Sequence, residues 1–413
     1  MQFSPIQVAK TAKSYIAARL NIWKFAKHCE RRFRGDVRYD LQNVTNGFLS
    51  RLNNSDDDSE LLERICAAYI RSVQQEQFAE GAYKPTERWQ KMRQNSLEPF
   101  LEALQARDIA ALRNMFQNFY RDPCSSGLLG APNGMSRAYF GGAIKDVYRR
   151  FYLGHVLYRF DYWLAQTNAR FTLHDLAGPG IGNPFGVLIE GTHISVGAEY
   201  AHYCAHRIAS LLDAPKATIA EIGGGFGGMA YYLLRDTPGV TYLDFDAPER
   251  IALASYYLLK AFPRRNFILY GEEKLTREGL TRGNGALMPM FALADAPSGS
   301  VDVTFSSHSL SNLSSEAMVE YLNQIGRITR GHFFLIGNQQ ACGSISDLIS
   351  RKGTPFQLAH TRPSGWHSYK VSGAGVGGAA GLAASATVEQ CYLRTENSKE
   401  LAARACCGPG ELK

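Results

Sequence analysis

The most constraining feature of this chain is a glycine-rich turn that joins two apolar runs. The run 217–222 leads into the turn 223–227, a helical stretch follows at 228–235, and the second run, 240–245, ends at Asp246. This order of strand, tight turn, helix, strand and acid is typical of α/β proteins that bind a nucleoside cofactor at the carboxyl ends of parallel strands. Glycines let the backbone approach the ligand, and an acid about 20 residues further on accepts hydrogen bonds from the ribose.

Two cofactor templates fit the turn. Gly223, Gly225 and Gly228 match the dinucleotide fingerprint, whereas Glu221, Gly223, Gly225 and Gly227 match the motif of S-adenosylmethionine (SAM) methyltransferases. A carboxylate two residues before the first glycine would repel a pyrophosphate. The same carboxylate attracts the ammonium and sulfonium charges of SAM through ordered water. The sequence therefore predicts SAM as the cofactor, with its methionine end wrapped by Glu221 and the three glycines.

The ribose and adenine ends need further residues. We expect Asp246 to hold the ribose, with Asp244 as a spare candidate on the other face of the strand. Glu272, after the third expected strand, is a candidate acid on the adenine side. Residues 286–293 are the alternative wall for the adenine.

Composition limits the class of protein. A chain of 413 residues has room for two domains, and it contains no apolar stretch of about 18 residues that would predict a membrane-spanning helix. The eight cysteines form no CxxC pair, which indicates reduced thiols in a cytosolic protein. The net charge of +7 is that of residues 1–34 alone, and the neutral remainder gives no reason to expect a nucleic-acid substrate.

Residues 1–34 form a basic amphipathic arm with helical periodicity. Three interpretations remain open: a helix docked on its own domain or on a second copy in a homo-oligomer, which we favour; peripheral attachment to an anionic membrane surface; and an organelle transit peptide. The apolar side of the expected helix consists of Val8, Ala12, Ile16, Leu20 and Trp23.

The chain divides into an α-helical region at 1–185, a core at 186–372 and a low-complexity tail at 373–413 with room for a last strand. Alternating strand and helix signals in the core predict an α/β fold with a Rossmann-like, doubly wound, mostly parallel sheet. The expected strands are 217–222, 240–245, 266–270, 301–306 and 332–337, and the expected helices are 228–235, 249–261 and 315–328.

Three segments together resemble a known family: the block Glu221–Gly228, the step Asp246-Ala-Pro-Glu249, and Ser306-Ser-His-Ser-Leu-Ser-Asn-Leu313. They are similar to class I SAM-dependent methyltransferases, and most of all to the sugar O-methyltransferase family of bacterial surface-polysaccharide loci. The resemblance covers roughly residues 85–340 and includes a helical region before the core. In that family an acid follows the serine–leucine pair, and here Asn312 stands near that place.

Methyl transfer to a sugar hydroxyl needs a base within about 2.6–3.2 Å of that hydroxyl. His308, just past the strand at 301–306, is the candidate base; the alternative is a histidine that orients the sulfonium or caps the next helix. His202 and His206 have a metal-ligand spacing but no accompanying carboxylates, so we predict no metal. A polar aromatic loop past the fifth strand is either an acceptor wall or ordinary packing, and it contains His360, Arg362, Trp366 and His367.

These observations predict a cytoplasmic enzyme, with the inner membrane face as a further location if the arm attaches there. The expected reaction is SAM-dependent O-methylation of a sugar or polysaccharide acceptor. Two rivals remain: a nicotinamide-dependent oxidoreductase, and a non-catalytic partner of a glycosyltransferase complex that docks through the arm.

Overall fold

The computed structural model describes residues 5–50, 57–129, 147–281, 285–351, 354–366 and 387–395, except the side chains of 5–18, Thr281 and Asn312. The chain forms two compact units, each built from separate segments. The first unit comprises 1–55, 117–203 and 365–385, and the second comprises 56–116, 204–364 and 386–413. The expected division at residues 185 and 372 stays a prediction, and the units group the helical segment 56–116 with the sheet.

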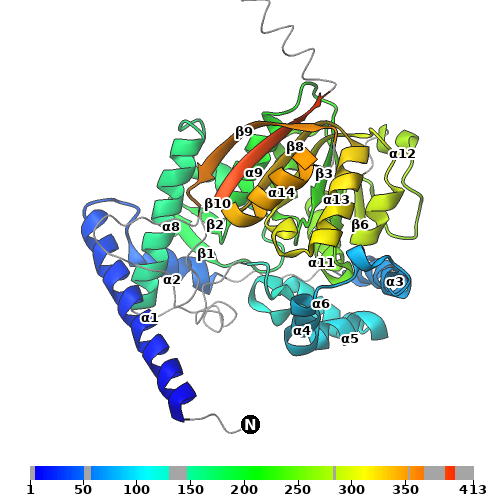
Figure 1. The fold of residues 1–413 in the computed structure, drawn as a ribbon. Helices are drawn as coiled ribbons and strands as arrows, with labels where there is room; N and C mark the ends of the chain where they lie inside the picture. The colour runs from blue at the N-terminus through cyan, green and yellow to red at the C-terminus, as the bar shows by residue number, and fades with distance from the viewer. Residues whose placement is uncertain are drawn as a thin grey trace, which may run out of the picture. The chain divides into compact units, whose positions relative to one another are not determined.

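An eight-stranded sheet forms the second unit, in the order β5-β6-β4-β3-β7-β8-β10-β9 (Figure 1). The six strands from β5 to β8 in this order are parallel, and β10 is antiparallel to both β8 and β9. The order reverses at β3, whose two neighbours are β4 and β7, so the predicted doubly wound, mostly parallel α/β fold is confirmed. The strands are β3 (Thr218–Ile222), β4 (Thr241–Asp246), β5 (Phe267–Leu269), β6 (Gly285–Pro289), β7 (Val301–Ser307), β8 (Thr329–Asn338), β9 (Phe356–Ser364) and β10 (Thr387–Arg394).

Helices cover both faces of this sheet, as a parallel sheet requires. Ala220 and Ile222 of β3 face a core that also holds residues of α13 and α14, whereas Glu221 points to the opposite face. Figure 1 shows α13 and α14 in front of the strands. The helices that connect or flank the strands are α9 (Ala198–Ala209), α10 (Gly228–Asp236), α11 (Pro248–Ala261), α12 (Arg277–Thr281), η6 (Met290–Asp295), η7 (Ser309–Asn312), α13 (Ser315–Ile328) and α14 (Gln339–Arg351).

Two strands differ from the sequence-based expectation. The sequence predicts no strand at β6, yet β6 lies between β4 and β5. Its sequence Gly-Ala-Leu-Met-Pro lacks β-branched and aromatic residues and ends in proline, so the strand signal is weak. The segment with His360 and Arg362 is not a loop but the edge strand β9, in which proline is tolerated because one side of the strand has no ladder to join.

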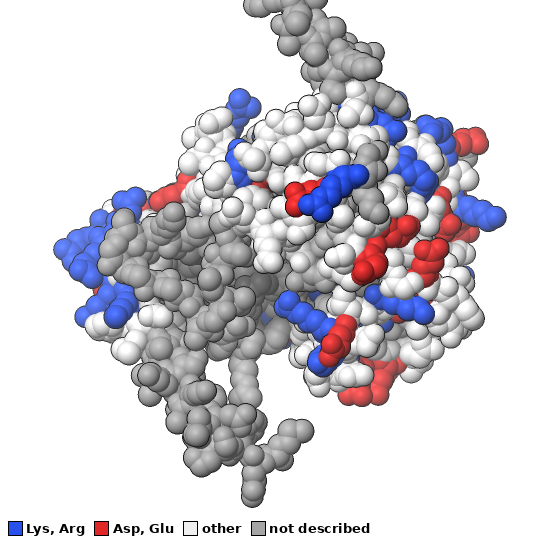
Figure 2. All heavy atoms as spheres, viewed as in Figure 1, with Lys and Arg blue, Asp and Glu red and all other residues white. Residues whose placement is uncertain are grey.

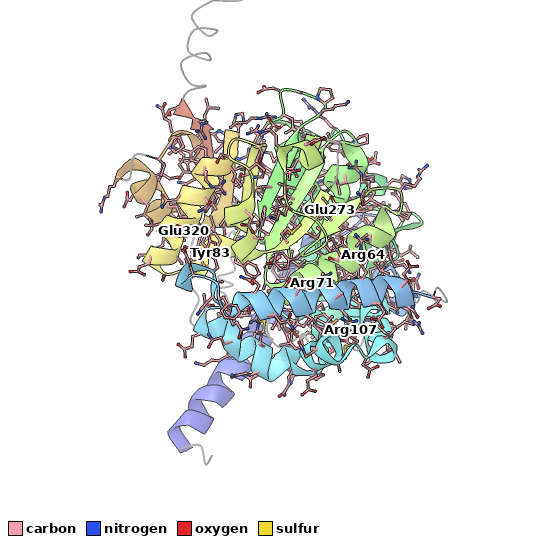
Figure 3. The ribbon with its side chains drawn as sticks, turned by 90° about the vertical axis from the view of Figure 1, so that its right-hand side faces the viewer. Arg64, Arg71, Tyr83, Arg107, Glu273 and Glu320 are labelled. Carbon is pink, nitrogen blue, oxygen red and sulfur yellow. The ribbon has the colours of Figure 1, made fainter. Side chains whose placement is uncertain are left out.

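The segment 57–116 packs on the sheet through buried polar ties. Asp58 accepts hydrogen bonds from Tyr256 at 2.8 Å and from Lys260 at 2.7 Å. Tyr83 donates to Glu320 Oε1 at 2.8 Å, where residues 81–83 meet α13 (Figure 3). The elements of this segment are α3 (Ser59–Glu76), η1 (Gly81–Tyr83), α4 (Glu87–Met92), η2 (Arg93–Leu97), α5 (Glu98–Ala106) and α6 (Ile109–Gln117).

A second buried group of hydrogen bonds joins the segment 57–116 to α11, the helix that follows Asp246. Glu249, in the first turn of α11, is only 2% exposed. Its carboxylate accepts from Arg93 Nε at 2.6 Å, from Arg93 Nη2 at 2.8 Å and from Trp89 Nε1 at 2.7 Å. Arg93 also pairs with Glu76 at 2.8 Å. Trp89 of α4 and Arg93 of η2 therefore hold Glu249, which is three residues after the ribose candidate Asp246.

The first unit is mainly helical. Aromatic side chains join α1 to α8: the rings of Phe25 and Phe151 lie 5.2 Å apart, and His28 Nε2 is 2.8 Å from Tyr158 Oη. No helix among the described residues is long and apolar enough to cross a membrane. Besides the amino-terminal part of α9, the elements are α1 (Pro5–Arg32), α2 (Leu41–Leu49), η3 (Phe119–Arg121), η4 (Pro123–Ser125), α8 (Val147–Gln166), η5 (Leu173–Leu176), β1 (Gly186–Ile189) and β2 (Thr192–Ser195).

In the carboxyl-terminal half of α1, the face that packs within the first unit is not the expected apolar side, and docking of that side on a second copy stays a prediction. Leu20 and Trp23 are 51% and 47% exposed, whereas the buried face is formed by Phe25, Ala26, Cys29 and Phe33. Trp23 and Phe25 are two residues apart, which places them about 200° apart around a helix. Steps of four residues drift around the helix, so a stripe read from Val8 onward misses the contact face.

The buried carboxylate of Glu249 gives a stability prediction. We expect Glu249→Ala to lower the free energy of unfolding by about 2–3 kcal/mol, because it leaves Nε of Arg93 and Nε1 of Trp89 without their buried acceptor, while Arg93 keeps its pair with Glu76. Glu87→Ala removes an exposed glutamate of α4, the helix that contains Trp89, and should cost less than about 1 kcal/mol. Thermal and urea unfolding of the three proteins measures both, and equal effects of the two changes would contradict the role given to Glu249.

Candidate functional site

The glycine turn lies at the carboxyl end of β3, where the strand order reverses. Gly223 has φ +85°, and a Cβ there would stand 1.8 Å from Ser309 Oγ. A Cβ on Gly224 would stand 2.6 Å from Cγ of Asp244. The turn therefore has no room for side chains at these two positions, because β4 and the end of β7 crowd it from both sides.

Three carboxylates converge on this turn. Glu221, Asp244 and Asp246 are 3%, 0% and 7% exposed. Gly224 N donates to Asp244 Oδ1 at 3.1 Å, and Gly225 N donates to Asp246 Oδ2 at 2.9 Å. The structure thus brings together the five residues that the sequence predicts for the cofactor: Glu221, Gly223, Gly225, Gly227 and Asp246.

Asp244 does not lie on the other face of the strand, as the sequence analysis expects, while its role as a spare ribose candidate stays a prediction. Residues two apart in a strand share a face, so Asp244 and Asp246 both point toward the glycine turn. Asp244 Oδ2 is buried and has no hydrogen-bond partner among the described residues. A buried acceptor of this kind either carries a proton or awaits a donor. The sequence-based analysis also missed Tyr242, whose hydroxyl donates to Glu221 Oε2 at 2.6 Å; its place two residues before Asp244 was the available signal.

Burial governs the charge state of the cluster. It raises the pKa of Glu221 from 4.5 to about 7, although the hydrogen bond from Tyr242 opposes the shift. Burial raises the pKa of Asp244 as well, and the neighbouring charges of Asp246 and Glu221 add to this. Burial also raises the pKa of Asp246, against the opposing charge of Arg250. None of the three forms an ion pair within the described part of the chain, so the cluster favours a positively charged ligand.

His308 lies beside the same turn. It follows β7 and precedes η7, and it has a left-handed backbone with φ 61°. Its amide donates to Ile336 O at 2.7 Å, and the next residue, Ser309, faces Gly223. Ser306 Oγ donates to Ile222 O at 3.0 Å, which fixes the end of β7 to the end of β3. Burial lowers the pKa of His308, so its ring is neutral at pH 7 and can accept a proton.

The adenine-side expectation for Glu272 does not fit the structure. Glu272 pairs with Arg64 at 2.6 Å and accepts from Leu269 N at 2.8 Å, at the β5 edge of the sheet. The strand beside β4 is β6, with Pro289 in register with Asp246. Residues 290–295 continue from that point, so the alternative wall at 286–293 is the one adjacent to Asp246.

The expected acceptor wall is divided. His360 and Arg362 lie on β9, and Arg362 pairs with Glu389 at 2.8 Å. Trp366 belongs to the first unit, where it is buried among aromatic rings and offers no face for stacking; Tyr162, Tyr200 and Tyr203 lie with ring centroids 4.9–5.4 Å from it. His367 lies outside the described residues.

The two helical histidines do not form a metal site with their surroundings. His202 Nδ1 accepts from Trp163 Nε1 at 3.2 Å. In the described ranges, no three His, Cys, Asp or Glu side chains are close enough to share a metal ion. Six cysteines have described positions, and all are buried free thiols.

Comparison with known proteins gives structural similarity only. No family model matches the chain, and no curated protein does. Among solved structures, the mitomycin 7-O-methyltransferase MmcR is 16% identical with a TM-score of 0.31, and the match covers 48% of this chain and 55% of that one. A geranyl diphosphate methyltransferase in complex with SAM is 9% identical with a TM-score of 0.33, over 47% of this chain and 85% of that one.

A TehB-like SAM-dependent methyltransferase from Corynebacterium glutamicum is 14% identical with a TM-score of 0.31, over 58% of this chain and 99% of that one. The match to the mitomycin 7-O-methyltransferase thus spans about half the length of that protein. At these identities and TM-scores, none of the similarities establishes a cofactor, a reaction or a substrate for this chain.

The carboxylate cluster predicts a pH-dependent stability in the ligand-free protein. Because the pKa of Glu221 is raised from 4.5 to about 7, its contribution to the free energy of unfolding is fully present below pH 4.5. That contribution is lost as the pH rises through about 7. At pH 8, Glu221→Gln should therefore be more stable than the unchanged protein, by on the order of 3 kcal/mol. Unfolding measured from pH 5 to pH 8 tests this, with the exposed Glu273→Gln as the matched control. An unchanged pH dependence in Glu221→Gln would refute the assignment.

Proposed function

We propose that this chain is a SAM-dependent O-methyltransferase that methylates a sugar hydroxyl of a bacterial polysaccharide or of its precursor. The observation that carries the proposal is the buried cluster of Glu221, Asp244 and Asp246 around a crowded glycine turn. A cluster of this charge suits a cationic cofactor. It disfavours the pyrophosphate of a nicotinamide dinucleotide, because like charges repel at short range in a buried site.

The residues fit SAM in three respects. Gly223 and Gly224 have no Cβ, which would collide with Ser309 and with Asp244, respectively, and which would keep a ligand away from the backbone of the turn. Asp244 Oδ2 has an unused lone pair beside the turn. Asp246 keeps one carboxylate oxygen on Gly225 N and the other on Ala247 N at 2.7 Å, and each oxygen retains capacity for a ribose hydroxyl. When bound, SAM supplies an electrophilic methyl group on a positively charged sulfur.

His308 has the place and the charge state for the base. We propose that its ring takes the proton of the acceptor hydroxyl as the oxygen attacks the methyl carbon. The close approach of Ser309 to Gly223 places this residue next to the glycine turn. Positioning of the hydroxyl in line with the departing sulfur supplies much of the rate in reactions of this kind.

The acceptor side is proposed to lie on the same face of the sheet. Glu221, Phe305, Phe334, Cys391 and His360 occupy one row across β3, β7, β8, β10 and β9. Neighbouring strands are about 4.8 Å apart, so the β9 end of this row is roughly 20 Å from Glu221.

A positive charge stands over this row. The guanidinium of Arg207 lies 5.8 Å from the ring centre of Phe334 and its Nε is buried without an acceptor among the described residues. Arg207 suits an acceptor that carries a carboxylate or phosphate between the reacting hydroxyl and β9.

For the basic arm, we propose peripheral contact with a membrane surface, with a glycosyltransferase or a second copy of the chain as the other partners. The support is the exposure of Leu20 and Trp23 beside exposed basic residues of α1.

Binding of the cofactor is the first test. We expect isothermal titration to show SAM and S-adenosylhomocysteine binding to the full chain and no binding of NAD. Asp246→Ala should abolish SAM binding, and Asp246→Asn should weaken it at least tenfold, roughly the loss of one charge-assisted pair of hydrogen bonds. Glu273→Ala serves as the control. NAD binding without SAM binding would select the oxidoreductase, and no binding of either would select the non-catalytic partner.

The role of His308 has a separate test. His308→Ala should bind SAM as the unchanged protein does but lose turnover by about 10²–10⁴-fold, which is the usual contribution of a positioned base. The exposed His174→Ala should leave turnover unchanged. Radiolabelled methyl transfer to a lysate sugar fraction provides the readout. Full turnover in His308→Ala would remove it as the base while leaving the cofactor assignment intact.

A further inference from the structure

A hollow of about 600 Å³ lies at the carboxyl end of α1 in the first unit. Lys27, Arg31 and Arg34 contribute positive charge to its lining, and Glu30 and Asp36 contribute negative charge. Asp36 is already held by Arg38, which donates from Nε at 3.0 Å and from Nη2 at 2.7 Å. Three cations therefore share the hollow with the carboxylate of Glu30, which forms no ion pair with an Arg or Lys among the described residues.

A hydroxyl that lacks an acceptor in the described part of the chain belongs to a residue that lines the hollow. Tyr39 lines it, with its ring 5.9 Å from that of Phe33. Its Oη is buried and has no hydrogen-bond partner in the described part of the chain. Burial raises the pKa of Tyr39 to about 12, so the group remains protonated and can donate. A buried donor without an acceptor points to a ligand that brings an oxygen.

Exposed apolar side chains flank the hollow. Trp23 lies beneath Lys27, whose Nζ is 4.4 Å from the ring centre, and Leu20 is one helical turn before Trp23. Val37, between two residues of the hollow's rim, is 86% exposed. These three are half of the six large apolar side chains that are exposed in the described ranges. Figure 2 shows Lys and Arg gathered over this end of α1, at the left edge of the view.

We propose that the hollow binds the phosphate of an anionic phospholipid and that this end of the first unit thereby lies on a membrane surface. Lys27, Arg31 and Arg34 attract the phosphate, and the Tyr39 hydroxyl donates to it. Leu20, Trp23 and Val37 enter the headgroup region beside it, where tryptophan is favoured. A soluble phosphate would leave these apolar side chains in water, which is why the lipid is the favoured source of the phosphate.

Vesicle flotation of the full-length protein tests the proposal. The unchanged protein should float with vesicles of phosphatidylcholine and phosphatidylglycerol, and not with vesicles of phosphatidylcholine alone. The double change R31Q/R34Q should weaken binding roughly 30-fold, since each basic residue near an anionic surface contributes about fivefold. The exposed pair R264Q/K274Q lowers the net charge equally outside the arm and should leave binding unchanged. W23S and Y39F separate the apolar flank from the hydroxyl, and each should weaken binding.

Three outcomes would overturn the proposal: no flotation, equal loss in the control pair, or no effect of Y39F and W23S. Titration with glycerol 3-phosphate distinguishes the sources of phosphate, because its binding without flotation would also overturn the membrane role. Capture of a protein partner in place of vesicles would do the same. The inference rests on the membrane contact proposed for the arm, so its failure would overturn that contact. SAM titration of the same samples should be unaffected by the arm variants, so such a failure is distinct from a failure of the proposed methyltransferase activity.

Discussion

Burial of negative charge at the ends of β3 and β4 is the constraint on which the candidate site depends. Three acids share one crowded turn without an ion pair in the described residues, and the charge of Arg250 acts on Asp246. Buried carboxylates with this little compensation are costly in a folded protein. Backbone amides of the turn and the hydroxyl of Tyr242 offset part of the cost. The remainder is stabilisation that the proposed cationic cofactor would supply, so the proposal derives its affinity and its charge selectivity from the same buried carboxylates.

The sheet arrangement brings these groups together from distant parts of the chain. β3 lies between β4 and β7, so the turn after β3 meets the acids of β4 on one side and the segment after β7 on the other. His308 and Ser309 follow β7 directly and are far from the turn in the sequence, although they lie beside it in the fold. A doubly wound sheet therefore places the glycine turn and the candidate base at one edge with no need for long loops.

The sequence was sufficient for the parts of this fold that local patterns determine. The strands at 217–222 and 301–306 are rich in buried apolar residues and the turn 223–227 contains four glycines, so their places follow from the residues alone. β6 was missed because its five residues carry little strand propensity and owe their place to pairing with β4 and β5. The contact face of α1 and the ion pair of Glu272 depend on which elements meet, and periodicity in one segment does not contain that information.

The attachment of α4 and η2 to the first turn of α11 has a consequence for how the chain can be divided. A fragment that starts at residue 186 would retain every residue of the candidate cofactor site. It would also carry Glu249 without Trp89 and Arg93, and Lys260 and Tyr256 without Asp58. The helical segment 57–116 is therefore an integral part of the unit that contains the sheet, and the unit that contains the candidate site is discontinuous in sequence.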